Sequence, residues 1–257
     1  MFRFVLHLKP EDLLKAYETY PGGFEVVRTY PDGSLDIAVY SEERPQSFPF
    51  PLVAEEEVRT KDWREFYKPV EVGRETLIVP PWETRRPEDK TVVVIKPGKA
   101  FGTGLHESTQ LCLELMEELD LKEKTVLDVG SGSGILSIFA LKRGAKKAVA
   151  VDVDPLAVEE TLENAVLNGV ADRIEVLQGG PSAVKGIFDL VLANLELKIF
   201  KRFLDQIAPK VGKEAVFSGL YGERELEDML RLLERFNLEP LKVASKNDWH
   251  ALLVRRG

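Results

Sequence analysis

The stretch VLDVGSGSG, residues 126–134, places three glycines directly after a continuous apolar run. A strand without alternating polar residues is typical of a parallel sheet that is covered on both faces. Glycines at the end of such a strand let the backbone turn closely around a ligand, and ligands of open α/β sheets bind at the carboxyl ends of the strands. The N-terminus of the helix that follows favours an anion. The stretch therefore predicts the ligand-binding turn of a βαβ unit.

The glycine spacing limits what this turn can bind. The three glycines follow the pattern G-x-G-x-G, whereas a dinucleotide-binding turn has G-x-G-x-x-G and would need glycine where this chain has Ile135. The Gly-Lys-Ser/Thr of a P-loop is also absent. The turn has the setting of a nucleotide site without the pattern that holds a diphosphate.

An acidic residue at the end of the second predicted strand indicates a ribose. Asp152 closes the apolar run AVAVD at 148–152 and lies 22 residues after Gly130. A carboxylate in this place can accept hydrogen bonds from two ribose hydroxyls. A ribose without a diphosphate favours an adenosyl ligand with an amino-acid tail, which the glycine turn would face.

The chain changes character along its length. From Ser108 onward, apolar runs alternate with helical patterns, which predicts an α/β fold with a doubly wound parallel sheet. The first 50 residues read instead as a small α+β unit with a strand at 2–8, a helix at 10–20 and a hairpin around PDG at 31–33.

A proline-rich segment, EERPQSFPFPL at 42–52, indicates a boundary after the small unit. A helical pattern follows it and ends before Pro69. We therefore expect a small substrate-recognition domain over 1–55, a linker helix over 56–70 and the main domain over 71–257.

Composition restricts the function classes. The 257 residues carry a formal net charge of -8, which argues against general nucleic-acid binding. The single cysteine excludes an internal disulfide and fits a reducing cytosol, and the three scattered histidines make a metal site improbable. No run reaches the roughly 18 apolar residues that span a bilayer, and the apolar N-terminal stretch is too short for a signal peptide. We expect a cytoplasmic monomer without a metal, a membrane span or direct contact with nucleic acid.

Several stretches together resemble known enzymes. Residues 126–140, 150–170 and 188–195 resemble the S-adenosylmethionine-dependent methyltransferases of the seven-stranded class. The segment KPGKAFGTGLHESTQLCLELM at 96–116 resembles the signature of the ribosomal protein L11 methyltransferase family, the bacterial protein-lysine methyltransferases. That family also has a small N-terminal domain, a linking helix and a PPW stretch, as at 80–82 here. The resemblance covers roughly residues 63–257, and the first 50 residues match in size and class only.

This resemblance implies a cofactor, a substrate and a set of binding residues. It implies S-adenosylmethionine as the methyl donor and ribosomal protein L11 as the partner that receives the methyl groups. AFGTGLHEST at 100–109 would cover the cofactor, with Phe101 against it and Thr109 both starting the next helix and contacting the ligand. The glycine turn, through Gly130 and Gly132, and Asp152 would complete the binding set. Phe101 could equally be core packing, and Thr109 could be a plain helix cap.

The reacting end is expected at Asn194, the last residue of the fourth predicted strand. Asn194 resembles the Asn of the N-P-P-Y signature of amine methyltransferases, although Leu195 and Glu196 replace the prolines. The resemblance implies that Asn194 contacts the cofactor and binds the attacking nitrogen; the alternative is a helix cap. His106 and Trp249 are candidate walls of the substrate channel.

The leading hypothesis is a methyltransferase that modifies lysine amines, and possibly the N-terminal amine, of ribosomal protein L11. An enzyme of the same fold that acts on another protein or a small molecule is the first alternative. A regulator that keeps the cofactor pocket without catalysis is the second.

Overall fold

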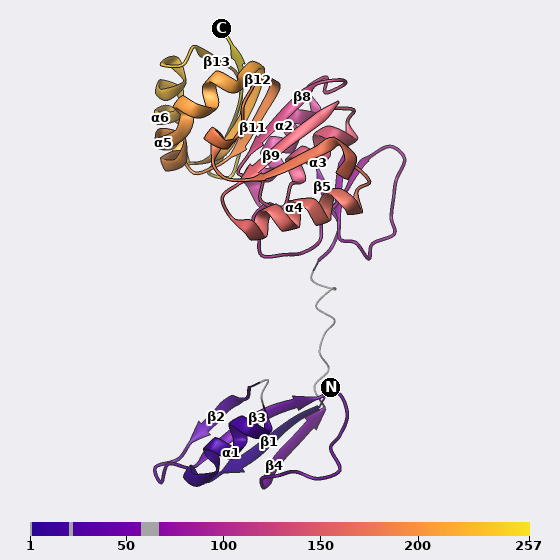
Figure 1. Ribbon diagram of the computed structural model, residues 1–257, viewed down its shortest axis with the longest axis vertical. Coiled ribbons are helices and arrows are strands. Elements are labelled where there is room, and N and C mark those ends of the chain that lie inside the picture. Colours follow the sequence, from indigo (N-terminus) through magenta and orange to yellow (C-terminus); the bar gives the residue numbers. More distant parts are fainter. Residues whose placement is uncertain (1, 21–22, 58–66) are drawn as a thin grey trace. The chain divides into compact units, whose positions relative to one another are not determined.

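The computed structural model describes residues 2–20, 23–57 and 67–257 (Figure 1). The chain divides into two compact units, Met1–Phe66 and Tyr67–Gly257. Each unit has its own buried apolar cluster.

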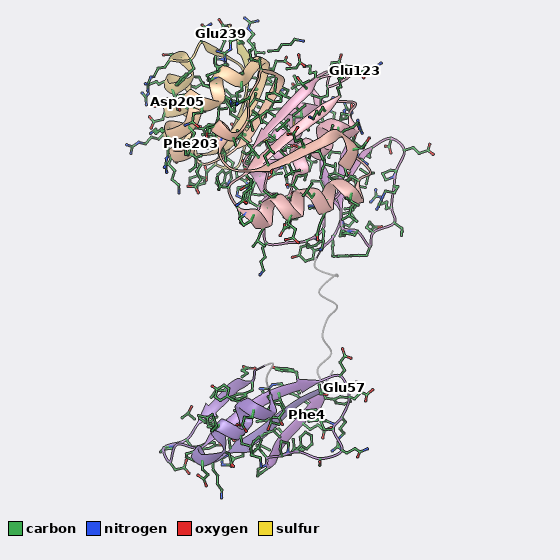
Figure 2. The ribbon with its side chains drawn as sticks, viewed as in Figure 1. Phe4, Glu57, Glu123, Phe203, Asp205 and Glu239 are labelled. Atoms are coloured by element: carbon green, nitrogen blue, oxygen red, sulfur yellow. The ribbon has the colours of Figure 1, made fainter. Side chains whose placement is uncertain are left out.

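The first unit is a four-stranded antiparallel sheet with a helix on one face. The strands lie in the order β2-β3-β1-β4, and Figure 2 shows Phe4 among the side chains of this unit. The elements are β1 (Phe2–Leu8), α1 (Leu13–Thr19), β2 (Glu25–Thr29), β3 (Leu35–Ser41) and β4 (Leu52–Glu57). Its core consists of Phe4, Leu6, Leu8, Ala16, Ile37, Val39 and Phe50. The α+β class, the first strand, the helix and the hairpin are as the sequence predicts.

The end of this unit differs from the expectation. Strand β4 pairs with β1 and runs on to Glu57, so the sheet extends beyond residue 55 and occupies the first two positions of the expected linker helix. Three consecutive glutamates favour a helix by propensity, but the pairing and the ion pairs Arg3–Glu56 and Arg44–Glu55 hold them in a strand. Residues 58–66, the centre of the expected helix, lie outside the described part of the chain.

The second unit is built on a seven-stranded sheet in the order β10-β9-β8-β11-β12-β14-β13. The strands β10, β9, β8, β11 and β12 are parallel to one another, and β14 is antiparallel to both of its neighbours, β12 and β13. A smaller sheet, β5-β6-β7, precedes it in the chain. The strands are β5 (Val70–Val72), β6 (Thr76–Val79), β7 (Thr91–Val94), β8 (Thr125–Val129), β9 (Lys147–Asp152), β10 (Ile174–Gln178), β11 (Phe188–Asn194), β12 (Val211–Tyr221), β13 (Leu238–Lys246) and β14 (Trp249–Arg256). The helices are α2 (Glu107–Glu117), α3 (Ile135–Lys142), α4 (Pro155–Leu167), α5 (Leu197–Ile207) and α6 (Gly222–Glu234).

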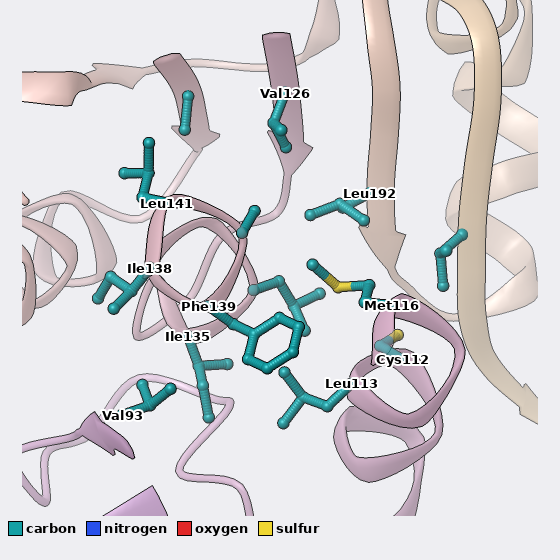
Figure 3. Packing of buried hydrophobic residues seen from close by; sticks show 14 of the residues in the cluster. Val93, Cys112, Leu113, Met116, Val126, Ile135, Ile138, Phe139, Leu141 and Leu192 are labelled. Atoms are coloured by element: carbon teal, nitrogen blue, oxygen red, sulfur yellow. The ribbon is translucent and has the colours of Figure 1, made fainter. Parts of the chain in front are cut away.

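Helices cover both faces of the large sheet. Along β8 and β11, successive side chains alternate between two separate apolar clusters. Val126 and Leu192 pack with residues of α2 and α3 such as Met116 and Phe139 (Figure 3), and the next residues along each strand pack with residues of α5 and α6. This confirms the predicted doubly wound fold. Among the described residues, no helix is long and apolar enough to cross a membrane.

Candidate functional site

A cavity of about 660 Å³ opens at the carboxyl ends of β8, β9 and β11. Because β9 and β11 flank β8 on opposite sides, this is the point where the direction of the sheet order reverses, which is the usual ligand site of such sheets. Seven of the eight residues selected from the sequence line it, namely Phe101, His106, Gly130, Gly132, Asp152, Asn194 and Trp249.

The glycine turn is held close to two neighbouring segments. The backbone N–H of Gly130 donates to Val151 O at 2.8 Å, and that of Gly132 donates to Asp152 Oδ2 at 2.9 Å. Gly132 has φ +54°, and a Cβ there would collide with the carbonyl oxygen of Phe101. Glycine is therefore required for backbone geometry and for close approach at this position.

Asp152 is fixed by the backbone around it. Its Oδ2 accepts the bond from Gly132, and its Oδ1 accepts from the backbone N–H of Asp154 at 3.0 Å. A carboxylate has about four acceptor positions, so two bonds leave capacity for hydroxyls in the cavity that Asp152 lines.

The segment 98–105, called the covering loop below, is held over the glycine turn by hydrogen bonds. The N–H groups of Lys99 and Ala100 donate to the Glu160 carboxylate on α4, at 2.7 and 3.2 Å. Ser133 of the turn donates from its backbone N–H to Phe101 O at 2.9 Å and from its hydroxyl to Gly102 O at 2.5 Å. The sequence does not single out Glu160, because a glutamate within a helical pattern carries no local signal of a contact with a distant loop.

Asn194 meets Thr109 across the site. The Asn194 Nδ2 donates to Thr109 Oγ1 at 3.2 Å. The helix cap that was considered as an alternative for Asn194 is not present, since α5 has Glu196 as its N-cap residue.

Thr109 is the predicted site residue that does not line the cavity. Its side chain is buried and bonds Asn194, while the preceding Ser108 reaches the cavity. The expectation that Thr109 starts and caps α2 is wrong: His106 is the N-cap residue, and its Nδ1 accepts from the backbone N–H of Ser108 at 3.2 Å. An imidazole nitrogen satisfies the free N–H of the first turn here in place of a hydroxyl.

His106 also joins two aromatic side chains of the cavity wall. Its ring centroid lies 5.1 Å from that of Phe101 and 4.5 Å from that of Trp249, both in edge-on geometry. Phe101 is 55% exposed, so it is a wall residue and not part of the core. The three side chains come from the covering loop, the cap of α2 and the start of β14.

Asp128 supports the site from beneath. Its Oδ2 accepts from the backbone N–H and the hydroxyl of Ser137 on α3, at 3.1 and 2.8 Å. Burial raises the pKa of Asp128 to about 6, with the bonds from Ser137 opposing the rise and the charge of Asp152 adding to it. Asp128 is not among the residues that line the cavity.

Further lining residues were not singled out from the sequence. They are mostly apolar and come from segments that only the folded sheet brings together, among them Val153, Leu195, Ile199, Phe203 and Gly219. Leu195, which stands in place of a motif proline, lies so close to Gly130 and Gly219 that a Cβ on either glycine would collide with it. Both positions therefore require glycine for Leu195 to take this place in the wall.

The lining chemistry fits an adenosyl ligand. Three carboxylates line the cavity, Asp152 and Asp154 after β9 and Glu196 after β11, the glycine turn offers its backbone, and Lys99 is the one Lys or Arg residue of the lining set. A diphosphate would call for more positive charge or for the fingerprint turns that are absent, whereas an apolar wall suits a base. Among the described residues, no three His, Cys, Asp or Glu side chains come together as metal ligands do.

Comparison with known proteins gives a consistent result. A family model described as "Ribosomal protein L11 methyltransferase (PrmA)" matches residues 36–257. A ribosomal protein L11 methyltransferase of Aquifex aeolicus is 44% identical over 197 residues, which are 77% of this chain and 76% of that protein. The corresponding protein of Caldicellulosiruptor bescii is 42% identical over 210 residues, or 78% and 67% of the two chains. A solved structure of a ribosomal protein L11 methylase from Lactobacillus delbrueckii subsp. bulgaricus has 32% identity and a TM-score of 0.69, covering 74% of this chain and 99% of that one.

Proposed function

Because this chain belongs to the ribosomal protein L11 methyltransferase family, we propose that it transfers methyl groups from S-adenosylmethionine to amines of ribosomal protein L11. Lysine side chains are the main acceptors and the N-terminal amine is a further one. The observation that carries the proposal is a single cavity that contains both a carboxylate at the end of β9 and the Asn194 amide at the end of β11.

The binding roles follow from the chemistry of the wall. Asp152 accepts hydrogen bonds from the ribose hydroxyls, and the glycine turn at Gly130 and Gly132 faces the amino-acid tail. Phe101 packs against the ligand from the covering loop. Thr109 acts through Asn194, whose amide it orients with a 3.2 Å hydrogen bond.

Catalysis requires mainly positioning. When bound, S-adenosylmethionine supplies a methyl group on a positively charged sulfur, and this sulfur is a good leaving group. The side-chain oxygen of Asn194 accepts a hydrogen bond from the substrate nitrogen that receives the methyl group. This bond holds the lone pair of that nitrogen toward the cavity. A lysine amine has a pKa of about 10.4 in water, and the low-polarity wall favours its neutral form. Glu196 and His106 line the cavity and can receive the proton.

The first unit is proposed to dock the protein substrate. The chain acts as a monomer in the cytoplasm, where ribosomal proteins are found, and its acidic surface suits a lysine-bearing target without direct contact to nucleic acid. Docking by a separate unit would present several amines to one site.

The test is to incubate the purified chain with labelled S-adenosylmethionine and a mixture of purified ribosomal proteins. We expect label on L11, and label that accumulates much more slowly with Asn194→Ala. Label on another protein would support the first alternative, a different substrate for the same fold. Cofactor binding without any labelled protein or small molecule would support the regulator.

A further inference from the structure

Four aromatic rings form a continuous row that begins in the cavity and ends outside it. The centroids of Phe101 and His106 lie 5.1 Å apart, those of His106 and Trp249 4.5 Å, and those of Trp249 and Tyr221 5.1 Å. Successive ring planes make angles of 62°, 72° and 61°. We call these four residues the aromatic row.

Tyr221 is the outer end of the row. The other three rings line the cavity, whereas Tyr221 does not, and it is 55% exposed. It is the last residue of β12 and pairs in register with Trp249 of β14. A large, half-exposed ring that continues a ligand cavity is available to a bound molecule.

Tyr221 is held in place by its surroundings. Its backbone N–H donates to Glu225 Oε2 at 2.8 Å, and its hydroxyl lies 3.4 Å from Asp248 Oδ2. The N–H of Gly222 donates to Asp248 O at 2.7 Å. The backbone bonds hold the end of β12, and the hydroxyl contact with Asp248 and the edge-on contact with Trp249 restrict the ring. This restriction lowers the entropy lost when the ring binds a ligand.

Carboxylates accompany the row. Asp248 and Glu225 bond Tyr221, and Glu107 is the first residue of α2 after His106. Two hydrogen bonds to the Glu107 carboxylate lower its pKa: the larger effect comes from the backbone N–H of Glu107 itself and the smaller from the Asn247 side chain. Glu107 is therefore ionised at neutral pH. Aromatic faces next to negative charges attract a cation.

We propose that the aromatic row binds the ammonium form of the substrate amine and prefers a methylated ammonium group to an unmethylated one. The proposal rests on the proposed function, since an amine methyltransferase makes such groups. An unmethylated ammonium ion is strongly hydrated, while each added methyl replaces an N–H donor by apolar surface that suits ring faces.

The test measures binding of free Nε-trimethyl-lysine and of its neutral carbon isostere to the full chain saturated with S-adenosylhomocysteine. NMR titration is suited to weak binding. The variants are Tyr221→Leu, which removes the ring, and Tyr221→Phe, which keeps it without the hydroxyl. We expect the wild type to prefer the cation, Tyr221→Phe to keep the preference, and Tyr221→Leu to weaken cation binding about two- to fivefold, as for an exposed cation–π contact.

The inference would be overturned by equal affinity of the wild type for cation and isostere, or by Tyr221→Leu binding the cation as the wild type does. Loss of the preference in Tyr221→Phe would also contradict it, because the hydroxyl and not the ring would then be responsible. The labelling of L11 separates this from the proposed function. Cation preference without labelled L11 would refute the function and keep the inference, and labelled L11 without cation preference would do the reverse.

Discussion

Asn194 combines two properties at one residue: it faces the cavity, and its amide is oriented by a buried hydroxyl 85 positions earlier in the chain. We expect Asn194→Ala to bind S-adenosylmethionine with an affinity within a few-fold of the wild type. We expect its kcat to fall about 10- to 100-fold, as for the loss of one hydrogen bond in the transition state. Calorimetry and initial rates on L11 separate the two effects.

Thr109→Val is the matched variant for Asn194→Ala, because it removes the 3.2 Å hydrogen bond to Asn194 and keeps the shape of the Thr109 side chain. It should lower kcat less than Asn194→Ala does. Wild-type turnover in both variants would remove the amide from the mechanism.

Asp128 makes stability depend on pH. Its pKa is about 6 in the folded chain against a reference value of 3.8, so the native state holds the proton more tightly than the unfolded state. The resulting stabilisation is complete below about pH 4 and is lost as the pH rises through 6. Two pH units of difference correspond to about 3 kcal/mol at most.

Asp128→Asn should remove this slope. Relative to the wild type, the free energy of unfolding of the variant should improve as the pH rises from 4 to 7, measured by urea denaturation at each pH. A constant difference between the two proteins over that range would show that Asp128 does not titrate there.

At the scale of elements, the glycine turn and the covering loop act as one piece. Gly132→Ala would drive a methyl group into the Phe101 carbonyl at a residue with φ +54°. We expect the Kd for S-adenosylmethionine to rise at least tenfold, since the loop must move. Gly169→Ala is the control, with φ +67° and no atom within 4 Å of the added carbon. It should lose about 1–2 kcal/mol of stability from backbone strain alone and keep its affinity.

The covering loop is also braced from the far edge of the sheet. Lys246 on β13 donates to Gln110 Oε1 at 2.6 Å, and the Gln110 amide donates to the carbonyls of Gly104 and Leu105 at 3.1 and 3.2 Å. Lys242, on the same strand, contacts Glu118, the C-cap residue of α2, at 2.5 Å but does not contact the loop.

Lys246→Met should therefore raise the Kd for S-adenosylmethionine a few-fold, while Lys242→Met should not. Both surface pairs contribute about 1 kcal/mol or less to stability, so melting temperatures should hardly differ. Equal Kd values in the two variants would show that the brace does not control the loop.

At the scale of the whole molecule, the cavity belongs to one unit. Every lining residue lies within Tyr67–Gly257, which has buried apolar clusters of its own. A chain of residues 67–257 should bind S-adenosylmethionine with an affinity within about twofold of the full chain, because all of the binding contacts remain. It should lose most of its activity on L11, which the first unit is proposed to dock. Full activity of the shortened chain on free L11 would refute the docking role.

Short sequence patterns were sufficient to predict much of the fold and part of the cavity. The order of strands and helices from Ser108 onward, the glycine turn and the acid at the end of β9 are all readable from apolar runs and residue spacing. They can be predicted because each depends on neighbours within one βαβ unit. The strand β4 was not predictable in the same way, since its glutamates become extended only by pairing with β1.

The sequence by itself determined the class of fold and the position of the cofactor turn, because hydrophobic period and glycine spacing are properties of short segments. Only the tertiary structure decided that the Thr109 hydroxyl meets Asn194. Only the tertiary structure brought Phe101, His106, Trp249 and Tyr221 into one row. The physical reason is that hydrogen bonds and ring contacts are short-ranged, so partners that are distant in the chain exist only once the sheet order has placed them side by side.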